Sequence, residues 1–461
     1  VLEPGQNGPL YYLMLRPWLH IAGESEYAFR FLSVVFGTLA VGLVYRLARR
    51  LFPSLPFLAL VAALLTATSP YLVWYSQEGK MYSLVLALVL ISMDRYLAAL
   101  ERGGWFRWLI YVASTGMAVY VHLVAALMIP VQLLAFFLTG ADTRRARWKG
   151  WLGSIGVLLL PYLPLLRWQL PLVLNPAETG YRFVPLHDML VSLLTNYSLG
   201  LNSGNLRWAI FFFLVLLFAA GWLWRNQRSR VASLGILGCW LLIPVLSFFL
   251  LTLVRPMYTA RYLIFLLPAY LILLAAGVVA IGARARLLAA VLLAALLVVN
   301  FLGLWRQGRT PIKTDFRSAT EYVASRWAAD DLLIFQIPYG RHSFDYYLSR
   351  YSERHRPHLP GEGVTPRSSM DHRVYLPLMA RQRAALYRWA EGLYTNGGMD
   401  PDLAFSAMEG RTSEASTVWL IATEVEMWDE RALVQTWLEQ HALLTDQAHF
   451  VRVSVYRFSL P

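Results

Sequence analysis

One short segment of the chain carries an acidic and a basic side chain among aromatic residues. Between Trp74 and Tyr82, Glu78 and Lys80 stand two residues apart, with Tyr75 and Tyr82 on either side. A lysine ammonium can neutralise a phosphate, and a nearby carboxylate can hold a sugar hydroxyl or orient a base. The same pattern also fits a plain turn at a membrane surface, in which the lysine extends towards water and the glutamate pairs with a neighbour.

A second segment carries two arginines six residues apart. Arg255 precedes a short polar stretch that ends in Arg261 and Tyr262. A guanidinium group suits bidentate recognition of a phosphate, so both arginines are candidate ligands of an anionic substrate. The alternative is that they anchor the chain at the level of the lipid head groups.

Other polar residues near apolar stretches are weaker candidates. His122 could act as a general base or donate to a phosphate, although a single histidine at a helix end is more often a structural residue. The segment that holds Gln6, Asn7 and Tyr11 offers amide and phenol groups typical of sugar contacts, but its Gly and Pro residues also predict a simple turn. Arg30 is expected to pair with Glu24 or Glu26.

The elements that must position these residues are apolar. Hydrophobic residues make up 57% of the 461 residues and charged residues only 15%, against roughly 25% charged residues in soluble domains. A membrane helix needs about 20 apolar residues. Ten stretches meet or approach that length: 28–46, 55–74, 81–99, 106–120, 122–140, 151–168, 207–224, 231–253, 262–281 and 286–304.

The basic residues predict the orientation of these spans. Lys and Arg outnumber Asp and Glu by 41 to 28, a net charge of +13, and many of them lie in every second connection between spans. Short basic connections face the cytoplasm. Residues 1–27, the 75–80 turn, the 169–206 loop, the 254–261 turn and the C-terminal segment are therefore expected on the outer side. Interfacial helices are expected near residues 10–19 and 186–194.

Several function classes find no support in the sequence. The chain has no GxGxxG segment, no phosphate-binding loop, no zinc-type Cys and His spacing and no Gly-x-Ser-x-Gly turn. Its single cysteine, Cys239, cannot form a disulfide within the chain. The spans also lack a chain of ionisable residues through their middles, which a pump would need. A divalent metal held by carboxylates is left open.

A soluble α/β domain is expected from residue 305 onwards. Here a helix that starts after Asp315, buried strands at 331–337 and 417–423, a helix at 429–441 and a strand at 450–458 alternate along the sequence. The stretch 351–375 is expected to be a loop. The predicted organisation is the rest of an external loop (1–27), a bundle of membrane helices (28–304) and an extracytoplasmic α/β domain (305–461).

The order of these motifs resembles a known group of enzymes. The segments 7–13, 23–37 and 75–82, Arg261 with Tyr262 and Pro268, and the segment 315–323 are similar to those of the GT-C glycosyltransferases. Within that superfamily they look like the protein-mannosyltransferase-like and aminoarabinose-transferase-like branch, glycosyltransferase family 39 and its relatives. The resemblance covers nearly the whole chain.

The resemblance implies a reaction and a set of site residues. Such enzymes move a sugar from a polyprenyl-phosphate carrier to an acceptor hydroxyl at the outer membrane face. Glu78, Lys80 and Tyr82 match the family's second-loop motif, and Arg261 with Tyr262 matches the motif near the carrier phosphate. Gln6 and Asn7 stand where relatives often have His or Lys. The family's catalytic carboxylate follows its first helix, which is expected upstream of Val1, and Glu3 is not expected to replace it.

The leading hypothesis is a multi-pass glycosyltransferase of the plasma (inner) membrane. Its partners would be a lipid-linked sugar donor, membrane lipid and a glycan, lipid or protein acceptor, without nucleic acid. Two alternatives remain: a non-catalytic, transport or flippase-type protein of envelope polysaccharide assembly, and an inactive relative whose external domain binds ligands. The sequence does not identify the sugar, the acceptor or the oligomeric state.

Overall fold

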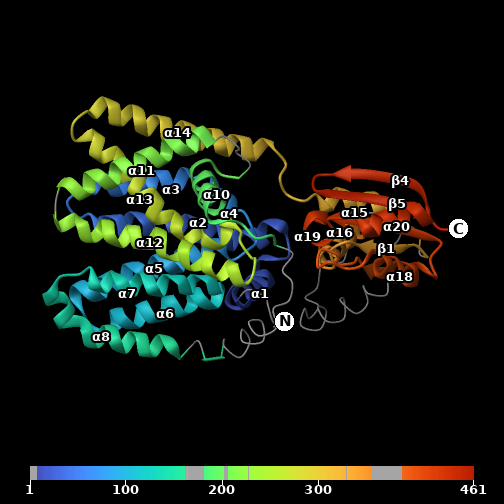
Figure 1. Cartoon of the computed structure of the whole chain (residues 1–461), viewed down its shortest axis with the longest axis horizontal. Coiled ribbons are helices and arrows are strands. Elements are labelled where there is room, and N and C mark those ends of the chain that lie inside the picture. Colours follow the sequence, from blue (N-terminus) through green and yellow to red (C-terminus); the bar gives the residue numbers. More distant parts are fainter. Residues whose placement is uncertain are drawn as a thin grey trace, which may run out of the picture. The chain divides into compact units, whose positions relative to one another are not determined.

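The computed structural model of the chain forms two compact units, residues 1–310 and 311–461 (Figure 1). Each is described here by itself. The structure describes residues 8–160, 163–164, 181–201, 206–226, 228–328, 330–354 and 387–461.

The first unit is a bundle of helices. They are α1 (Leu10–Ala22), α2 (Glu26–Leu51), α3 (Pro56–Thr68), α4 (Pro70–Ser76), α5 (Tyr82–Arg102), α6 (Trp105–Val121), the short 3-10 helix η1 (Leu123–Leu127), α7 (Met128–Phe137), α8 (Ala141–Leu159), α10 (Leu186–Leu199), α11 (Leu206–Asn226), α12 (Arg228–Val254), the 3-10 helix η2 (Ala260–Leu266), α13 (Leu267–Gly282) and α14 (Arg286–Arg309).

Each predicted apolar stretch falls on one of these helices or on a consecutive pair. Three stretches are interrupted: 55–74 is divided into α3 and α4, 122–140 into η1 and α7, and 262–281 into η2 and α13. The stretch 151–168 coincides with the end of α8, and most of its remainder lies outside the described residues. The helical fold class is therefore confirmed.

Several of the helices can cross a membrane, and the chain is a multi-pass membrane protein. Among the described residues, five helical segments pass on length and hydropathy, and the bent pair α3 and α4, with an angle of 56° between them, would make a sixth. The shorter segments Leu123–Phe137 and Arg207–Ala219 are also apolar. The five are α2, α5, residues 232–254 of α12, η2 with α13, and α14.

The break between α3 and α4 has a local cause. Pro70 has no backbone N–H and cannot continue the hydrogen bonds of α3. Ser69, in an extended conformation, caps α4 by accepting a hydrogen bond from the backbone N–H of Leu72 at 3.4 Å. The side-chain amide of Asn300 in α14 donates to the hydroxyl of Thr68 at 3.0 Å. The polar groups at the break are thus partly satisfied inside the bundle.

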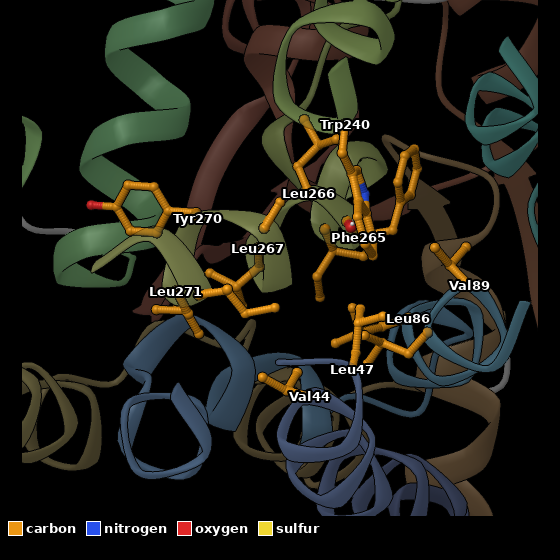
Figure 2. Close-up of a cluster of buried hydrophobic side chains, with 14 of the residues drawn as sticks. Val44, Leu47, Leu86, Val89, Trp240, Phe265, Leu266, Leu267, Tyr270 and Leu271 are labelled. Atoms are coloured by element: carbon orange, nitrogen blue, oxygen red, sulfur yellow. Dashed lines mark hydrogen bonds between the residues drawn. The ribbon is translucent and has the colours of Figure 1, made fainter. Parts of the chain in front are cut away.

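The centre of the bundle is a continuous apolar core. Figure 2 shows side chains of α2, α5, α12, η2 and α13 meeting there, with Val44 and Leu47 opposite Leu86 and Phe265. The buried Trp240 packs among them, and its indole N–H donates to the Phe265 carbonyl at 3.0 Å. This core fixes η2 against α5, which matters for the site described below.

One buried carboxylate lies inside a predicted span. Asp94 of α5 is 2% exposed and forms ion pairs with Arg46 at 3.0 Å, with Arg50 at 2.8 Å and with the adjacent Arg95 at 2.6 Å. Arg50 also pairs with Glu101. The sequence shows no chain of ionisable residues through the spans, and this single buried carboxylate was not predicted. Its charge is tolerated because three guanidinium groups surround it.

The second unit contains a mixed sheet with helices between its strands. Its elements are α15 (Phe316–Ala324), β1 (Leu332–Phe335), α16 (Gly340–Arg354), β2 (Arg388–Glu391), α18 (Pro401–Thr412), β3 (Thr417–Thr423), α19 (Val425–Trp428), α20 (Leu433–His441), β4 (Leu443–Phe450) and β5 (Val453–Ser459). The strand order is β2-β1-β3-β5-β4. Strands β1, β2 and β3 are parallel, whereas β5 runs antiparallel to β3 and to β4.

The sheet differs from the expectation in two strands. The predicted strands at 331–337, 417–423 and 450–458 correspond to β1, β3 and β5, but β2 and β4 were not predicted. β2 has only four residues, and β4 is an edge strand whose side chains are mostly exposed. Neither strand therefore shows the apolar run or the regular alternation that marks a strand in a sequence. The helix predicted from Asp429 begins at Leu433, and the first residues of the predicted loop 351–375 still belong to α16.

The Asp94 network gives a stability prediction. Replacing Asp94 with Asn should lower the free energy of unfolding by on the order of 3 kcal/mol, because it leaves three arginines without their shared counter-charge. Glu101→Gln is the matched control, since Glu101 is 45% exposed and pairs with Arg50 alone; its effect should stay under about 1 kcal/mol. Thermal unfolding of the purified full-length protein in detergent measures both. Equal effects of the two variants would contradict the assignment.

Candidate functional site

The turn between α4 and α5 presents a carboxylate that is only half satisfied. One oxygen of Glu78 accepts a hydrogen bond from the indole N–H of Trp74 at 3.1 Å. The other oxygen is buried and has no hydrogen-bond partner among the described residues. A buried carboxylate oxygen without a partner costs free energy unless a ligand donates to it. Glu78 is thus suited to receive a hydroxyl group.

Arg261 of η2 lies beside the same turn. Its guanidinium carbon is 5.9 Å from the ring centroids of Tyr82, the first residue of α5, and of Tyr262. One guanidinium nitrogen donates to the Tyr181 hydroxyl at 3.4 Å. Glu78 precedes Tyr82 by four residues, in the turn that leads into α5. Two segments about 180 residues apart in the sequence therefore meet around Tyr82.

His122 lies against the same aromatic rings. It is 3% exposed, and its ring centroid is 6.1 Å from that of Tyr82 and 5.1 Å from that of Tyr262. Neither ring nitrogen has a hydrogen-bond partner within the described part of the chain. His122 occupies the break between α6 and η1, where its extended backbone ends the helix. We refer to Glu78, Tyr82, His122, Arg261 and Tyr262 as the site cluster.

The beginning of the described chain supports the turn from the other side. The hydroxyl of Tyr11 in α1 donates to the Ser33 hydroxyl at 3.2 Å, which in turn donates to the backbone carbonyl of Lys80 at 3.0 Å. Gly8 packs so closely on the end of α6 that an added Cβ would lie 2.0 Å from the Tyr120 carbonyl oxygen. The segment before α1 is thus held next to His122. The predicted residues Gln6 and Asn7, and Glu3, lie outside the described residues.

Two glycine contacts bring the turn close to α2. An added Cβ on Gly37 would lie 2.0 Å from the Ser76 hydroxyl, and one on Gly79 would lie 2.0 Å from the ring of Phe29. Real Cβ atoms do not approach other atoms so closely. The turn can pack this closely on α2 because Gly37 and Gly79 have no side chain.

The other predicted residues lie in different surroundings. Lys80 is exposed, and within the described residues no ion pair of its ammonium is present. Arg255 follows the end of α12 and is half-buried, with its backbone N–H bonded to the Leu251 carbonyl at 3.0 Å. Arg30 pairs with Glu26 at 3.5 Å, as expected. The structure thus brings Glu78, Tyr82, His122, Arg261 and Tyr262 together, whereas Lys80 lies exposed in the same turn and Arg255 lies at the end of α12.

Sequence reasoning missed three residues that shape this site. Trp74 and Ser33 were not singled out, although each hydrogen-bonds directly to the turn. Tyr181 lies in the stretch that was expected to be a loop, yet its hydroxyl contacts Arg261 and lies 3.5 Å from the Tyr262 hydroxyl. No motif marks these contacts, because each depends on how distant helices pack. Within the described segments, no three His, Cys, Asp or Glu side chains gather as a metal site would require.

Comparisons with known proteins bear on the fold. Residues 6–168, 163 of the 461 residues, match the model of the family described as dolichyl-phosphate-mannose-protein mannosyltransferase. The structure is similar to that of ArnT from Cupriavidus metallidurans in the apo state, with a TM-score of 0.57 and 14% identity, covering 99% of this chain and 88% of that one. The chain has the GT-C fold.

A second crystal structure agrees with this fold. ArnT from Cupriavidus metallidurans bound to undecaprenyl phosphate is similar with a TM-score of 0.55 and 15% identity, again covering 99% of this chain and 88% of that one. No curated protein matches the sequence. At such low identity the likeness shows the GT-C fold alone, so the activity must be argued from the site residues.

The support of the turn can be tested in this GT-C bundle. Ser33→Ala removes the hydrogen bond to the Lys80 carbonyl and leaves the Tyr11 hydroxyl without its acceptor, so it should destabilise the protein by about 1–2 kcal/mol. Hydrogen exchange of the 77–82 amides should become faster at the same time. Thr38→Ala, which removes only a hydrogen bond within α2 on its exposed side, is the control. Unchanged exchange in Ser33→Ala would show that the turn is held without it.

Proposed function

We propose that the chain transfers a sugar from a polyprenyl-phosphate carrier to an acceptor hydroxyl at the outer membrane face. The observation that carries this proposal is that Arg261 lies near the ring of Tyr82, at the end of the turn that carries Glu78. The match to a mannosyltransferase family and the likeness to ArnT, one crystal structure of which contains undecaprenyl phosphate, support it. ArnT is a glycosyltransferase with the same fold.

Arg261 would hold the carrier phosphate. Its guanidinium is enclosed by the rings of Tyr82 and Tyr262, and its Nε is buried without a hydrogen-bond partner among the described residues. A cation kept away from water interacts more strongly with a phosphate than an exposed one. Lys80, exposed at the edge of the turn, would neutralise the second charge of the phosphate as it leaves.

Glu78 would act on a hydroxyl. In the transfer, the bond from the sugar carbon to the phosphate oxygen breaks, and the phosphate leaves with the electron pair. The acceptor oxygen forms the new bond to that carbon, and its proton passes to a carboxylate that acts as the base. The free oxygen of Glu78 can accept a hydrogen bond from a hydroxyl of the sugar or of the acceptor, while Trp74 holds the other oxygen in place.

The outer side is proposed from the distribution of charge. α5 begins at the Glu78 turn and ends at Arg102, so the site cluster lies at the opposite end of this helix from the ion pair of Arg50 with Glu101. Basic helix ends face the cytoplasm. The site cluster would then face outwards, and the inner membrane would be the location of the protein, with its C-terminal unit on the outer side.

A transport function is the second candidate, and one observation favours it. Transporters commonly bind substrates where membrane helices are broken, and α3 and α4 form such a broken pair with an angle of 56°. Against this, the Thr68 hydroxyl at the break is already bonded to Asn300. Sealed vesicles containing the protein and the lipid-linked sugar distinguish the two functions, since an enzyme modifies the acceptor without moving the carrier across the membrane.

Removal of the two cationic side chains proposed to bind the carrier phosphate should strongly reduce transfer. In Arg261→Ala and Lys80→Ala, loss of a charge-assisted contact of about 3 kcal/mol should reduce carrier-dependent transfer at least ~100-fold. Binding of undecaprenyl phosphate to the full-length protein in nanodiscs, and conversion of a polyprenyl-phosphate-linked sugar followed by mass spectrometry, provide the measurements. Arg30→Ala is the control, because Arg30 lies at a helix start but pairs with Glu26. Folded variants with wild-type rates would refute the proposal.

The role of Glu78 can be separated from phosphate binding. Glu78→Gln keeps the size of the side chain and an oxygen for the Trp74 indole, but it removes the charge that would attract a proton. Transfer should fall by about 10²-fold or more, while undecaprenyl phosphate binding should stay equal or become tighter because a nearby negative charge is lost. If carrier binding weakened as much as transfer, Glu78 would be a structural residue of the turn instead.

A further inference from the structure

The sheet of the second unit has a point where ligands commonly bind. In the sheet order, β2, the strand that follows β1 in the sequence, lies on one side of β1, whereas β4 and β5, which follow β3 after α19 and α20, lie on the far side of β3. The connections of the parallel neighbours β1 and β3 thus diverge at their carboxyl ends. In open α/β sheets this divergence leaves a crevice, which is the usual place of a binding site.

Two residues bridge that point. Tyr339 follows β1 and Glu424 directly follows β3, and the tyrosine hydroxyl donates to the glutamate carboxylate. Tyr339 is 53% exposed, so its ring can be reached by a ligand. Glu424 adopts a left-handed conformation with φ of 48°, and such a conformation costs a non-glycine residue on the order of 1 kcal/mol.

A second aromatic pair lies in the segments that follow β2 and β3. Trp428 at the end of α19 and Tyr394 after β2 pack edge to face, with ring centroids 4.9 Å apart. The Trp428 indole nitrogen is buried and has no hydrogen-bond partner among the residues that the structure describes. Buried indole N–H groups almost always find an acceptor. A ligand oxygen would supply the missing acceptor.

Hydrogen bonds within the protein hold the loops that carry these residues in place before any ligand binds. The buried carboxylate of Asp429 accepts hydrogen bonds from the Thr395 hydroxyl at 2.6 Å and from the backbone N–H groups of Leu433 and Val434 at 2.9 and 3.0 Å. The backbone N–H of Thr395 donates to the Trp428 carbonyl at 2.9 Å. The loop after β2 and the loop after β3 are thereby joined, so a ligand would not have to order them.

The charge at this edge limits the ligand class. In a chain with a net charge of +13, the carboxyl ends of β2 and β3 and the loops that follow are rich in acids: Glu391, Asp400, Asp402, Glu424, Glu426 and Glu430. The cations at this edge are already bound within the protein: Arg431 donates to the Thr395 carbonyl at 2.9 Å, Arg411 donates to the Glu391 carbonyl, and Arg341 pairs with Asp345 at 3.4 Å. A phosphate or another anion would be repelled here. Carboxylates beside exposed aromatic rings instead suit sugars, whose C–H faces stack on rings and whose hydroxyls donate to carboxylates.

We propose that the carboxyl edge of β1, β2 and β3 is a saccharide-binding site, separate from the site cluster of the bundle. Its ligand class is a neutral or amino-bearing oligosaccharide. A sugar ring packs on Tyr339, a sugar hydroxyl donates to Glu424, and a sugar oxygen accepts from the Trp428 indole. The inference does not depend on the activity proposed for the bundle.

A glycan array tests this proposal with the full-length protein. Fluorescently labelled protein in nanodiscs is applied to printed neutral, amino-bearing and acidic oligosaccharides. Retention on neutral or amino-bearing glycans is expected, with little on acidic ones. Tyr339→Ala removes the exposed ring and Trp428→Phe removes the indole donor; each should weaken the retention at least ~10-fold. Leu443→Ala is the matched control, because Leu443 is 72% exposed at the opposite edge of the sheet and should change nothing.

Two further variants separate this site from the bundle and from a loss of folding. Arg261→Ala should bind glycans like the wild type, so failure of the enzymatic proposal would leave this result intact. Glu424→Gly relieves the left-handed backbone and should keep the thermal stability of the protein while losing glycan retention. Absence of retention on every glycan class, or retention that Tyr339→Ala and Trp428→Phe leave unchanged, would overturn the proposal. Competition by free oligosaccharide against the same glycan on a lipid distinguishes which form is preferred.

Discussion

The cost of placing an ionised group in hydrocarbon governs where chemistry can occur in this protein. The helices that form its core are apolar along most of their length, so polar side chains collect where helices end or break. Glu78 lies in the turn between α4 and α5, His122 lies between α6 and η1, and Arg261 lies in the short helix before α13. Asp94 follows the same rule in another way, since it is buried only together with its arginines. The residues of the site cluster thus lie close together because several helices end or break at the same place.

The sequence was sufficient to predict that these apolar segments are helical, although three of them are interrupted. Hydropathy located every apolar stretch, and the basic connections placed Glu78 and Arg261 on one side, although the chain between them is long. What it could not predict were contacts that depend on helix rotation, such as Ser33 under the Lys80 carbonyl or Tyr181 beside Arg261. The strands β2 and β4 were missed because one is very short and the other is an exposed edge. Local patterns are strong for long buried elements and weak wherever tertiary packing decides.

The fold and the function rest on different kinds of support. A likeness of 14–15% identity to ArnT over nearly the whole chain establishes the GT-C fold, but folds of this kind host more than one substrate. Support for sugar transfer therefore comes from individual groups. One carboxylate oxygen of Glu78 has no donor among the described residues, and the Arg261 guanidinium lies near tyrosine rings. In the second unit, the indole N–H of Trp428 is a buried donor that has no acceptor among the described residues. Each proposed site therefore contains a buried polar atom that has no hydrogen-bond partner among the described residues.

The two close glycine contacts of α2 with the Glu78 turn imply an uneven tolerance to sequence drift. A change at Glu78 or Arg261 alters chemical groups on a scaffold that keeps its shape, so a lineage could lose or exchange its activity and still assemble the bundle. A methyl group at Gly37 would instead collide with Ser76, and one at Gly79 would collide with Phe29. New specificities would then be expected to arise by exchange of the polar side chains, while the two glycines stay. Gly37 and Gly79 would then be the positions of this site that change most slowly.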